Sequence, residues 1–310
     1  MKKILSIVLA LMLIIGAVPF AMAEDAQVAI ILKALGNPFW ETMKKGIEDK
    51  AAELGVQVDI FAANSEEDVE GQLLILENAI GKGYKAIGVA PLSPTNLNNA
   101  IAQAMREGIY VINIDEKVDI DALKALGGNV MGFTTTDNVA VGKIAGDDIV
   151  ASLPEGGKVA IIEGKAGNAS GKHRADGAKS AFDAAENIEL VESQPADWDR
   201  TKAYDVATNY ITKHPDLKAI YCCNDTMAMG ALEAVKASNL DILVYGTDGN
   251  PDAVASVEAG ELTGTVAQDP AGIGARAFEL LLSYIETGAA IDLEAEVPVE
   301  YVDAFLIKKQ

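Results

Sequence analysis

Histidine and cysteine are scarce in this chain, and their scarcity argues against several kinds of catalytic site. The two histidines, His173 and His214, lie 41 residues apart, so a histidine-rich metal site is not available and a Ser-His-Asp triad has little to draw on. The two cysteines, Cys222 and Cys223, are adjacent, and a disulfide between neighbours closes almost no loop and is strained. We therefore expect no metal, no cofactor and two free thiols in a buried strand.

Positive charge is also in short supply. The formal net charge is −21, with 25 Lys and Arg against 46 Asp and Glu. A surface this acidic repels nucleic acid and anionic lipid alike. The composition therefore predicts no nucleic-acid partner.

Long apolar runs are missing after the first twenty residues. The run Ile4–Phe20 follows two lysines and ends in the small-residue pattern AMA, which together indicate a secretory signal peptide, residues 1–23, cut before Glu24. The run is shorter than the roughly 20 residues that a membrane-spanning helix needs. No cysteine stands at the cleavage point for a lipid anchor, so the mature chain is predicted to be free in the periplasm or secreted.

Aromatic residues make up 5% of the chain, yet two of them are neighbours in LGNPFW, residues 35–40. The pair Asn37-Pro38 starts a predicted helix that ends at Gly55. Adjacent side chains on a helix point about 100° apart, so Phe39 fits the core-facing stripe and Trp40 lies off it. Trp40 is therefore expected to do something other than fill the core.

Short β-rich runs alternate with amphipathic helical stretches, the pattern of β-α units around parallel sheets. A chain of this length suggests two domains, and the stretch TTTDN after the non-periodic insert 117–130 gives a weak boundary near Thr136, where Thr136 or Asp137 caps the helix 139–152. We expect an α/β fold of two doubly wound parallel-sheet domains, with four β-α units on each side and a ninth strand left over. The predicted strands are Val28–Leu32, Val56–Phe61, Ala86–Val89, Tyr110–Ile114, Lys158–Ile162, Ile188–Glu192, Ala219–Cys222, Leu243–Tyr245 and Gly264–Ala267.

Polar and aromatic residues follow the carboxyl ends of several predicted strands, where open α/β folds bind ligands. Each has an ordinary alternative: Asp248 as turn chemistry, Asn224 as a helix cap, Trp198 as partial core. One such residue would mean little, but polar or aromatic residues follow six predicted strands, and this repetition indicates a ligand site. The candidates are Lys33, Asn37, Phe39, Trp40, Asp115, Glu116, Asn168, Trp198, Asn224, Asp248 and Gln268.

This set suits a neutral polyol better than an ion or a peptide. A pyranose has apolar C–H faces that rest on aromatic rings and a rim of hydroxyls that needs donors and acceptors. The rings of Trp40 and Trp198 would cover the faces, with Phe39 beside them. The three carboxylates would accept bonds from hydroxyls, while Lys33 and the amides would donate.

The chain resembles a known family, the ribose-type periplasmic sugar-binding proteins of ABC transporters, and within it the allose-binding branch. The resemblance rests on LKALGNPFWETMKKGIED, TTDNVAVG, VAIIEGKAGNASG, SQPADWDR, KAIYCCNDTMAMG and TVAQDPAGIGA, and covers most of residues 24–310. The allose branch matches at Lys33, Trp40, Glu116 and Asn168. Cys223 departs from the pattern, since a small Ala is expected there, and residues 285–302 match weakly.

The resemblance implies a type I binding-protein fold and an exported protein that delivers a monosaccharide, D-allose or a similar aldohexose, to ABC permease subunits. It also implies a monomer, and a chemoreceptor as a further partner. The sugar would contact the eleven candidate residues. Three crossings near Thr136, Gln268 and Val302 would form a hinge between one lobe of residues 24–136 and 269–301 and another of residues 137–268 and 302–310.

Three alternatives follow from the same residues. A glycoside hydrolase would use two carboxylates of the set about 5 to 9 Å apart, whereas Asp115 and Glu116 diverge from one loop. A dinucleotide-binding enzyme is disfavoured, because GIGARA, residues 272–277, follows Pro270 inside a helical stretch rather than a strand-to-helix turn. A sugar-responsive transcription regulator is excluded by the lack of a helix-turn-helix before Val28.

Overall fold

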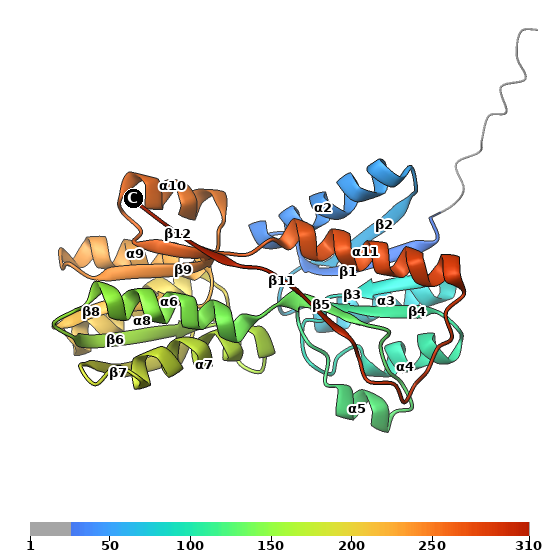
Figure 1. Cartoon of the computed structure of the whole chain (residues 1–310), viewed down its shortest axis with the longest axis horizontal. Helices are drawn as coiled ribbons and strands as arrows, with labels where there is room; N and C mark the ends of the chain where they lie inside the picture. Colours follow the sequence, from blue (N-terminus) through green and yellow to red (C-terminus); the bar gives the residue numbers. More distant parts are fainter. Residues whose placement is uncertain (1–25, 310) are drawn as a thin grey trace, which may run out of the picture.

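The computed structural model describes residues 26–309, so the predicted signal peptide lies outside the described residues. Two six-stranded sheets, each with helices on both faces, stand side by side (Figure 1). We call the sheet β11-β5-β4-β3-β1-β2 with its helices the N-lobe, and the sheet β12-β10-β9-β8-β6-β7 with its helices the C-lobe. The strands pair in parallel except β12, which is antiparallel to β10.

The bounds of the elements follow the chain. The N-lobe contains β1 (Val28–Ala34), α2 (Pro38–Leu54), β2 (Val58–Ala63), α3 (Val69–Lys82), β3 (Ala86–Val89), α4 (Asn98–Arg106), β4 (Tyr110–Ile114), α5 (Ile120–Ala125), β5 (Phe133–Thr136), α11 (Pro270–Thr287) and β11 (Val299–Val302). The C-lobe contains α6 (Asn138–Ser152), β6 (Gly157–Glu163), α7 (Ala169–Asp183), β7 (Ile188–Pro195), α8 (Arg200–Lys213), β8 (Leu217–Cys222), α9 (Asp225–Ser238), β9 (Leu243–Asp248), α10 (Pro251–Ala259), β10 (Gly264–Ala267) and β12 (Phe305–Lys308).

Helix ends form where the sequence signals place them. The Asn37 side chain accepts a hydrogen bond from the Phe39 amide at the start of α2, and Gly55 ends the helix at a left-handed φ of 68°. Asp137 caps α6 in the same way. Gly55 is needed there because other residues pay a steric cost at positive φ.

All nine predicted strands are present, although β2 starts two residues later than expected. The strands β5, β11 and β12 and the helix α5 were not predicted. β5 reads FTTT and is buried throughout, so it lacks the alternation that marks a strand from sequence. β11 and β12 are four-residue edge strands whose formation depends on distant partners, β5 and β10.

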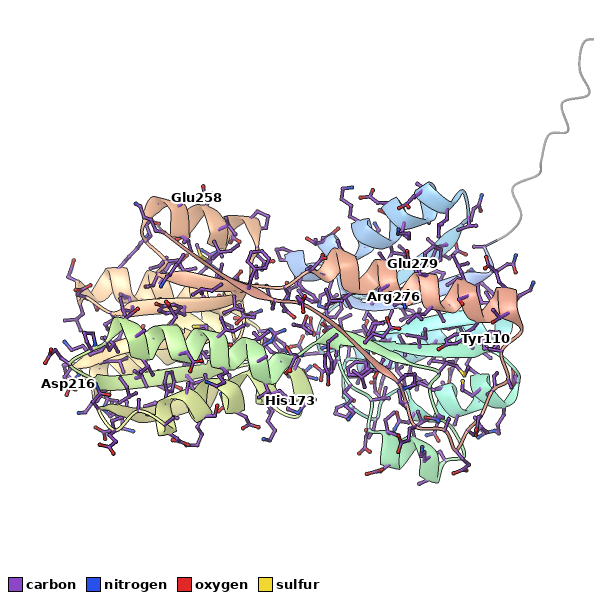
Figure 2. All side chains as sticks on the ribbon, viewed as in Figure 1. Tyr110, His173, Asp216, Glu258, Arg276 and Glu279 are labelled. Atoms are coloured by element: carbon purple, nitrogen blue, oxygen red, sulfur yellow. The ribbon has the colours of Figure 1, made fainter. Side chains whose placement is uncertain are left out.

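The chain passes between the lobes at three places: after β5, after β10 and between β11 and β12 (Figure 1). The predicted fold class is confirmed. Helix α11 returns to the N-lobe, where its apolar face packs with α2 and β1. Its outer face carries Arg276 and Glu279 (Figure 2), and Arg276 also pairs with Glu300 of β11, which ties the last N-lobe strand to this helix.

The cysteines are buried free thiols, as expected, with Cys222 ending β8 and Cys223 just beyond it. None of the helices between residues 26 and 309 is both long enough and apolar enough to span a bilayer.

Candidate ligand site

A pocket lies between the lobes, at the carboxyl ends of the strands, and holds about 320 Å³ of empty space, part of it open to solvent. Eight of the eleven predicted residues line it, and Glu116, Asn168 and Gln268 do not. Glu66, Ser170 and Arg174 line it without having been predicted. The lining residues are Lys33, Asn37, Phe39, Trp40, Glu66, Asp115, Ser170, Arg174, Trp198, Asn224 and Asp248.

Lys33 brings a buried cation to the N-lobe side of the pocket. It stands near the end of β1 and is 3% exposed, and its Nζ donates to Glu116 Oε2 at 3.3 Å. Burial alone would lower the pKa of Lys33, but the carboxylates of Glu116, Glu66 and Asp115 outweigh it and raise the pKa. Lys33 therefore keeps its charge although it is buried.

Two aromatic rings stand beside Lys33. Phe39 and Trp40 meet edge to face with centroids 5.0 Å apart, and the Lys33 ammonium lies 5.5 Å from the Trp40 ring. Trp40 Nε1 donates to Glu66 Oε1 at 3.3 Å. Trp40 is 3% exposed and belongs to the same apolar cluster as Phe39, because the first turn of α2 is covered on both sides; the expectation that only Phe39 would pack was wrong.

Arg174 brings the matching cation to the C-lobe side. It comes from the middle of α7, where its guanidinium donates to Cys223 O at 2.7 Å, to Asn138 Oδ1 at 2.8 Å and to Asp248 Oδ1 at 3.4 Å. The sequence signal that could have found it is its place among the small buried residues Gly171 and Ala178 of α7, since a charge on a buried small-residue face needs a partner.

Trp198 covers the C-lobe side of the pocket. The Arg174 guanidinium lies 5.9 Å from its ring, and its Nε1 donates to Asn168 Oδ1 at 3.3 Å. The ring lies directly over Gly164, where a Cβ would overlap it. A glycine at this position is therefore what lets the ring lie flat against the end of β6.

Three pocket residues hold strained backbone conformations. Asp115, Trp198 and Asp248 have φ values of 58°, 65° and 123°, a region that non-glycine residues rarely occupy. Thr135 Oγ1 donates to the Asp115 carbonyl at 2.9 Å and helps to hold the first of these turns. Strain of this kind clusters at ligand sites, because the surrounding structure fixes the side chain's direction.

The carboxyl groups of Asp115 and Asp248 face the pocket in an environment that resists ionisation. Burial raises the pKa of Asp115 to about 7, although Lys33 and Arg174 pull it down. Burial also raises the pKa of Asp248, against the effect of Arg174 and a bond from Gln268 Nε2 at 2.7 Å. A ligand that donates hydrogen bonds to these two carboxylates would therefore stabilise their ionised form.

The predicted residues outside the pocket support those that line it. Gln268 holds Asp248, Asn168 holds the Trp198 indole, and Glu116 lies behind Lys33. Asn224 both lines the pocket and caps α9, accepting from the Met227 amide at 2.9 Å. Within residues 26–309 no group of three or more His, Cys, Asp or Glu side chains is placed to hold a metal ion.

Comparison with known proteins places this arrangement in a family. Residues 28–290 match the family model described as a periplasmic binding protein domain. The chain is 54% identical to the D-allose-binding periplasmic protein of Escherichia coli, over 91% of this chain and 92% of that protein. It is 36% identical to the ribose import binding protein of Haemophilus influenzae, over 97% and 98%.

The fold agrees with these relatives. The crystal structure of a periplasmic solute-binding protein from Actinobacillus succinogenes with bound D-allose superposes with a TM-score of 0.85 at 31% identity, covering 92% of this chain and 98% of that one. Proteins of this kind bind and carry solutes rather than transform them, which decides against the glycoside hydrolase alternative. The chain belongs to the periplasmic binding protein family.

Proposed function

We propose that this chain is the substrate-binding protein of a sugar ABC importer, that it binds one monosaccharide, D-allose or a similar aldohexose, between its lobes, and that it delivers the sugar to the permease. Relatives named for D-allose and ribose support the sugar class. The residues of the pocket support the neutral, hydroxyl-rich character of the ligand.

Unpaired buried acceptors carry the proposal. In the described part of the chain, Asp115 Oδ1 and Glu66 Oε2 belong to residues that line the pocket, are buried and have no hydrogen-bond partner. Both are acceptors, and a buried acceptor without a donor costs about 1–3 kcal/mol. A ligand that satisfies them must donate several hydrogen bonds without bringing a second anion, which is what the hydroxyls of a sugar do.

The aromatic rings restrict the ligand further. Trp40 with Phe39 on one lobe and Trp198 on the other provide flat apolar surfaces for the C–H faces of a sugar. Rings on two sides of one pocket suit a ligand with two apolar faces, as a single sugar ring has.

The sugar contacts that we propose are the predicted residues that line the pocket together with Glu66, Ser170 and Arg174. Lys33 and Arg174 donate to the sugar, and Asp115 and Asp248 accept from it. Asn168 and Gln268 hold contacting residues in place.

The proposal also covers the location, oligomeric state and partners of the protein. The family is periplasmic, and we propose export through the predicted signal peptide 1–23, a monomeric protein, permease subunits as its delivery partner and a chemoreceptor as a further one. Light scattering of the purified chain checks the monomer, since a mass twice that of one chain would contradict it.

Isothermal calorimetry against a panel of monosaccharides tests the function. D-allose should bind with a free energy of roughly −8 kcal/mol or more favourable, which corresponds to micromolar affinity or better. L-allose, with the same groups in mirror arrangement, is the matched control and should not bind. Saturation by no sugar in the panel, or release of product from aryl glycosides, would refute the proposal.

A further inference from the structure

We infer that Glu116 does not touch the sugar but latches the two lobes together by capping helix α7 of the C-lobe from the N-lobe. The inference rests on the proposed function in one respect: its effect on ligand release presupposes that a sugar binds between the lobes. Glu116 follows β4, is 0% exposed and is absent from the pocket lining, whereas sequence comparison alone places it on the sugar.

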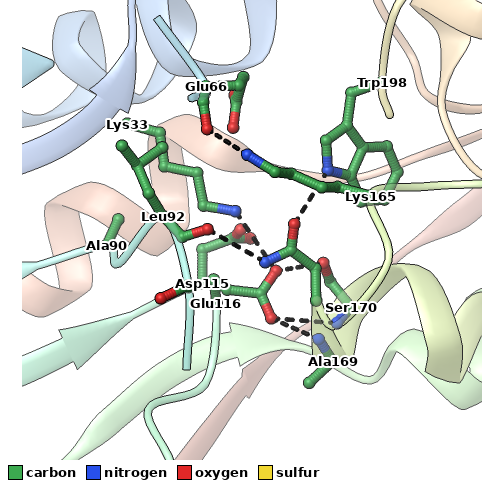
Figure 3. Close-up of polar contacts among 12 residues, drawn as sticks. Lys33, Glu66, Ala90, Leu92, Asp115, Glu116, Lys165, Ala169, Ser170 and Trp198 are labelled. Atoms are coloured by element: carbon green, nitrogen blue, oxygen red, sulfur yellow. Dashed lines mark hydrogen bonds and ion pairs between the residues drawn. The ribbon is translucent and has the colours of Figure 1, made fainter. Parts of the chain in front are cut away.

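Every oxygen of the Glu116 carboxylate is already engaged. Oε1 accepts from the Ala169 amide at 2.6 Å and the Ser170 amide at 3.3 Å, while Oε2 accepts from Ser170 Oγ at 2.7 Å and Lys33 Nζ at 3.3 Å. Figure 3 shows the carboxylate of Glu116 between Lys33 on one side and Ala169 and Ser170 on the other. Three of its four bonds therefore cross from the N-lobe to the C-lobe.

Helix α7 needs this cap, because its own cap residue is occupied elsewhere. Asn168 is of a residue type that caps helices well, yet its side chain makes no capping bond. Its Oδ1 accepts from Trp198 Nε1, and its Nδ2 donates to Leu92 O of the N-lobe at 3.4 Å. A carboxylate at a helix start is favoured by the helix dipole and by charge-assisted hydrogen bonds, so Glu116 supplies what Asn168 does not.

Glu116 is held rigidly on the N-lobe side. Asn113 Nδ2 donates to the Glu116 carbonyl at 2.7 Å and to Val89 O at 3.2 Å, and Asn113 Oδ1 accepts from the Val118 amide. Separation of the lobes would leave the carboxylate in place and take the start of α7 away from it. Opening then leaves the amides at the start of α7 without their cap. Loss of a helix cap of typical energy lowers the ratio of closed to open molecules by about 2- to 30-fold.

The latch also connects closure to the ligand. Lys33 lines the sugar pocket and shares Glu116 Oε2 with Ser170, which lines the pocket from the other lobe. A sugar that orders Lys33 and Ser170 therefore also orders the two sides of the latch. Lys165, which donates to Glu66 O, makes a further bridge between the lobes beside that from Asn168 to Leu92 O (Figure 3).

The sharpest test is Ala169→Pro, which deletes one latch donor and leaves the pocket-lining residues unchanged. Ala169 is the first residue of α7, where proline is well tolerated, as Pro38 and Pro270 show at the same position of α2 and α11. Asn168, with φ −79° and ψ 131°, already has the conformation that a residue before proline prefers. Arg200→Pro is the matched control, since Arg200 starts α8 in the same lobe after Asp199 at φ −99° and ψ 132°.

Sugar dissociation by stopped flow and the radius of gyration by X-ray scattering are the readouts. Ala169→Pro and Glu116→Gln should each raise the dissociation rate about 2- to 30-fold and increase the radius of gyration at partial saturation, whereas Arg200→Pro should match the unaltered chain. Folded Ala169→Pro protein with an unaltered rate and radius would overturn the latch. If that variant does not fold, Glu116→Gln decides by the same two readouts.

Deoxy sugars separate a latch from a sugar contact. If Glu116 only latches, Glu116→Gln weakens binding of the parent sugar and of each single-deoxy analogue by one common factor, apart from the hydroxyl that Lys33 binds, and Ala169→Pro does so by a common factor of its own. A selective loss at any other hydroxyl would overturn the inference.

If the unaltered chain binds no sugar, the proposed function fails alone. The latch is then judged by hydrogen exchange of the Ala169 and Ser170 amides, which Glu116→Gln should accelerate and Arg200→Pro should not.

Discussion

The two sides of the pocket are built from the same kinds of group but are held in different ways. The N-lobe side has Lys33, Asp115 and Trp40, and the C-lobe side has Arg174, Asp248 and Trp198. Each side therefore offers one cation, one carboxylate and one large ring. A ligand between them meets similar chemistry on both of its faces.

Both cations bond to partners in their own lobe, and the difference lies in what those partners bond to in turn. Arg174 bonds only within its own lobe, to Cys223 O, Asn138 and Asp248, so that side is assembled whether or not the lobes meet. Lys33 relies on Glu116, whose remaining bonds come from the C-lobe. The C-lobe side is thus preorganised, and the N-lobe side is completed by closure.

Removal of the C-lobe cation should have the largest effect. Arg174→Met removes the buried cation that pairs with Asp248, which keeps its bond from Gln268, and leaves the acceptor of Asn138 without its donor; breaking a buried pair costs about 3–5 kcal/mol. The free energy of unfolding of the ligand-free protein, measured in urea, should fall by that amount. Lys33→Met is the matched variant, and a similar loss there would mean that the two sides do not differ in this way.

Removal of the N-lobe cation should act on binding rather than on folding. Lys33→Ala should weaken sugar binding by about 1–3 kcal/mol, or 5- to 150-fold, because sugar oxygens lose a buried donor. Circular dichroism should stay unchanged, since Glu116 keeps its donors from α7. A flat titration with folded Lys33→Ala protein would contradict the role that we give to this side.

Acidity should affect the ligand-free and sugar-bound protein in opposite directions. The pKa of Asp115 is raised from 3.8 to about 7, so its contribution to stability is fully present below pH 3.8 and is lost as the pH rises to about 7. The sugar prefers the ionised carboxylate, so its dissociation constant should fall by up to about 30-fold between pH 5.5 and pH 8. Thermal melts should show a larger sugar-induced rise in Tm at pH 8, and Asp115→Asn should remove most of this difference.

The aromatic surfaces should give the smallest effect. Trp198→Phe keeps an aromatic ring but loses the indole bond to Asn168, and Trp40→Phe loses the bond to Glu66. We expect each to weaken binding by about 0.5–1.5 kcal/mol and to remove part of the sugar-induced change in tryptophan fluorescence. If both variants kept the full fluorescence change, neither ring would lie against the sugar.

Sequence could predict the parts of the site that depend on local signals. Lys33, Asp115 and Asp248 come at or near the ends of strands that are recognisable by themselves, so the topology of parallel sheets brings them to one edge. Arg174 was missed because its signal is indirect: the small residues Gly171 and Ala178 must first be recognised as a buried face of α7 before a cation among them is seen to need a partner. The bonds of Glu116 to Ala169 and Ser170 could not be predicted, because these partners lie more than fifty residues away and only the fold brings them together.

The last strands, β11 and β12, have a consequence for biosynthesis. Each forms the edge of a different sheet, β11 beside β5 and β12 beside β10, and only two residues separate them. Because a ribosome makes the chain from its amino end, the N-lobe sheet lacks its last strand until synthesis has passed residue 302, and the C-lobe sheet lacks its last strand until synthesis has passed residue 308. Both lobes therefore stay incomplete until nearly the whole chain has been made, so neither can finish folding early in synthesis.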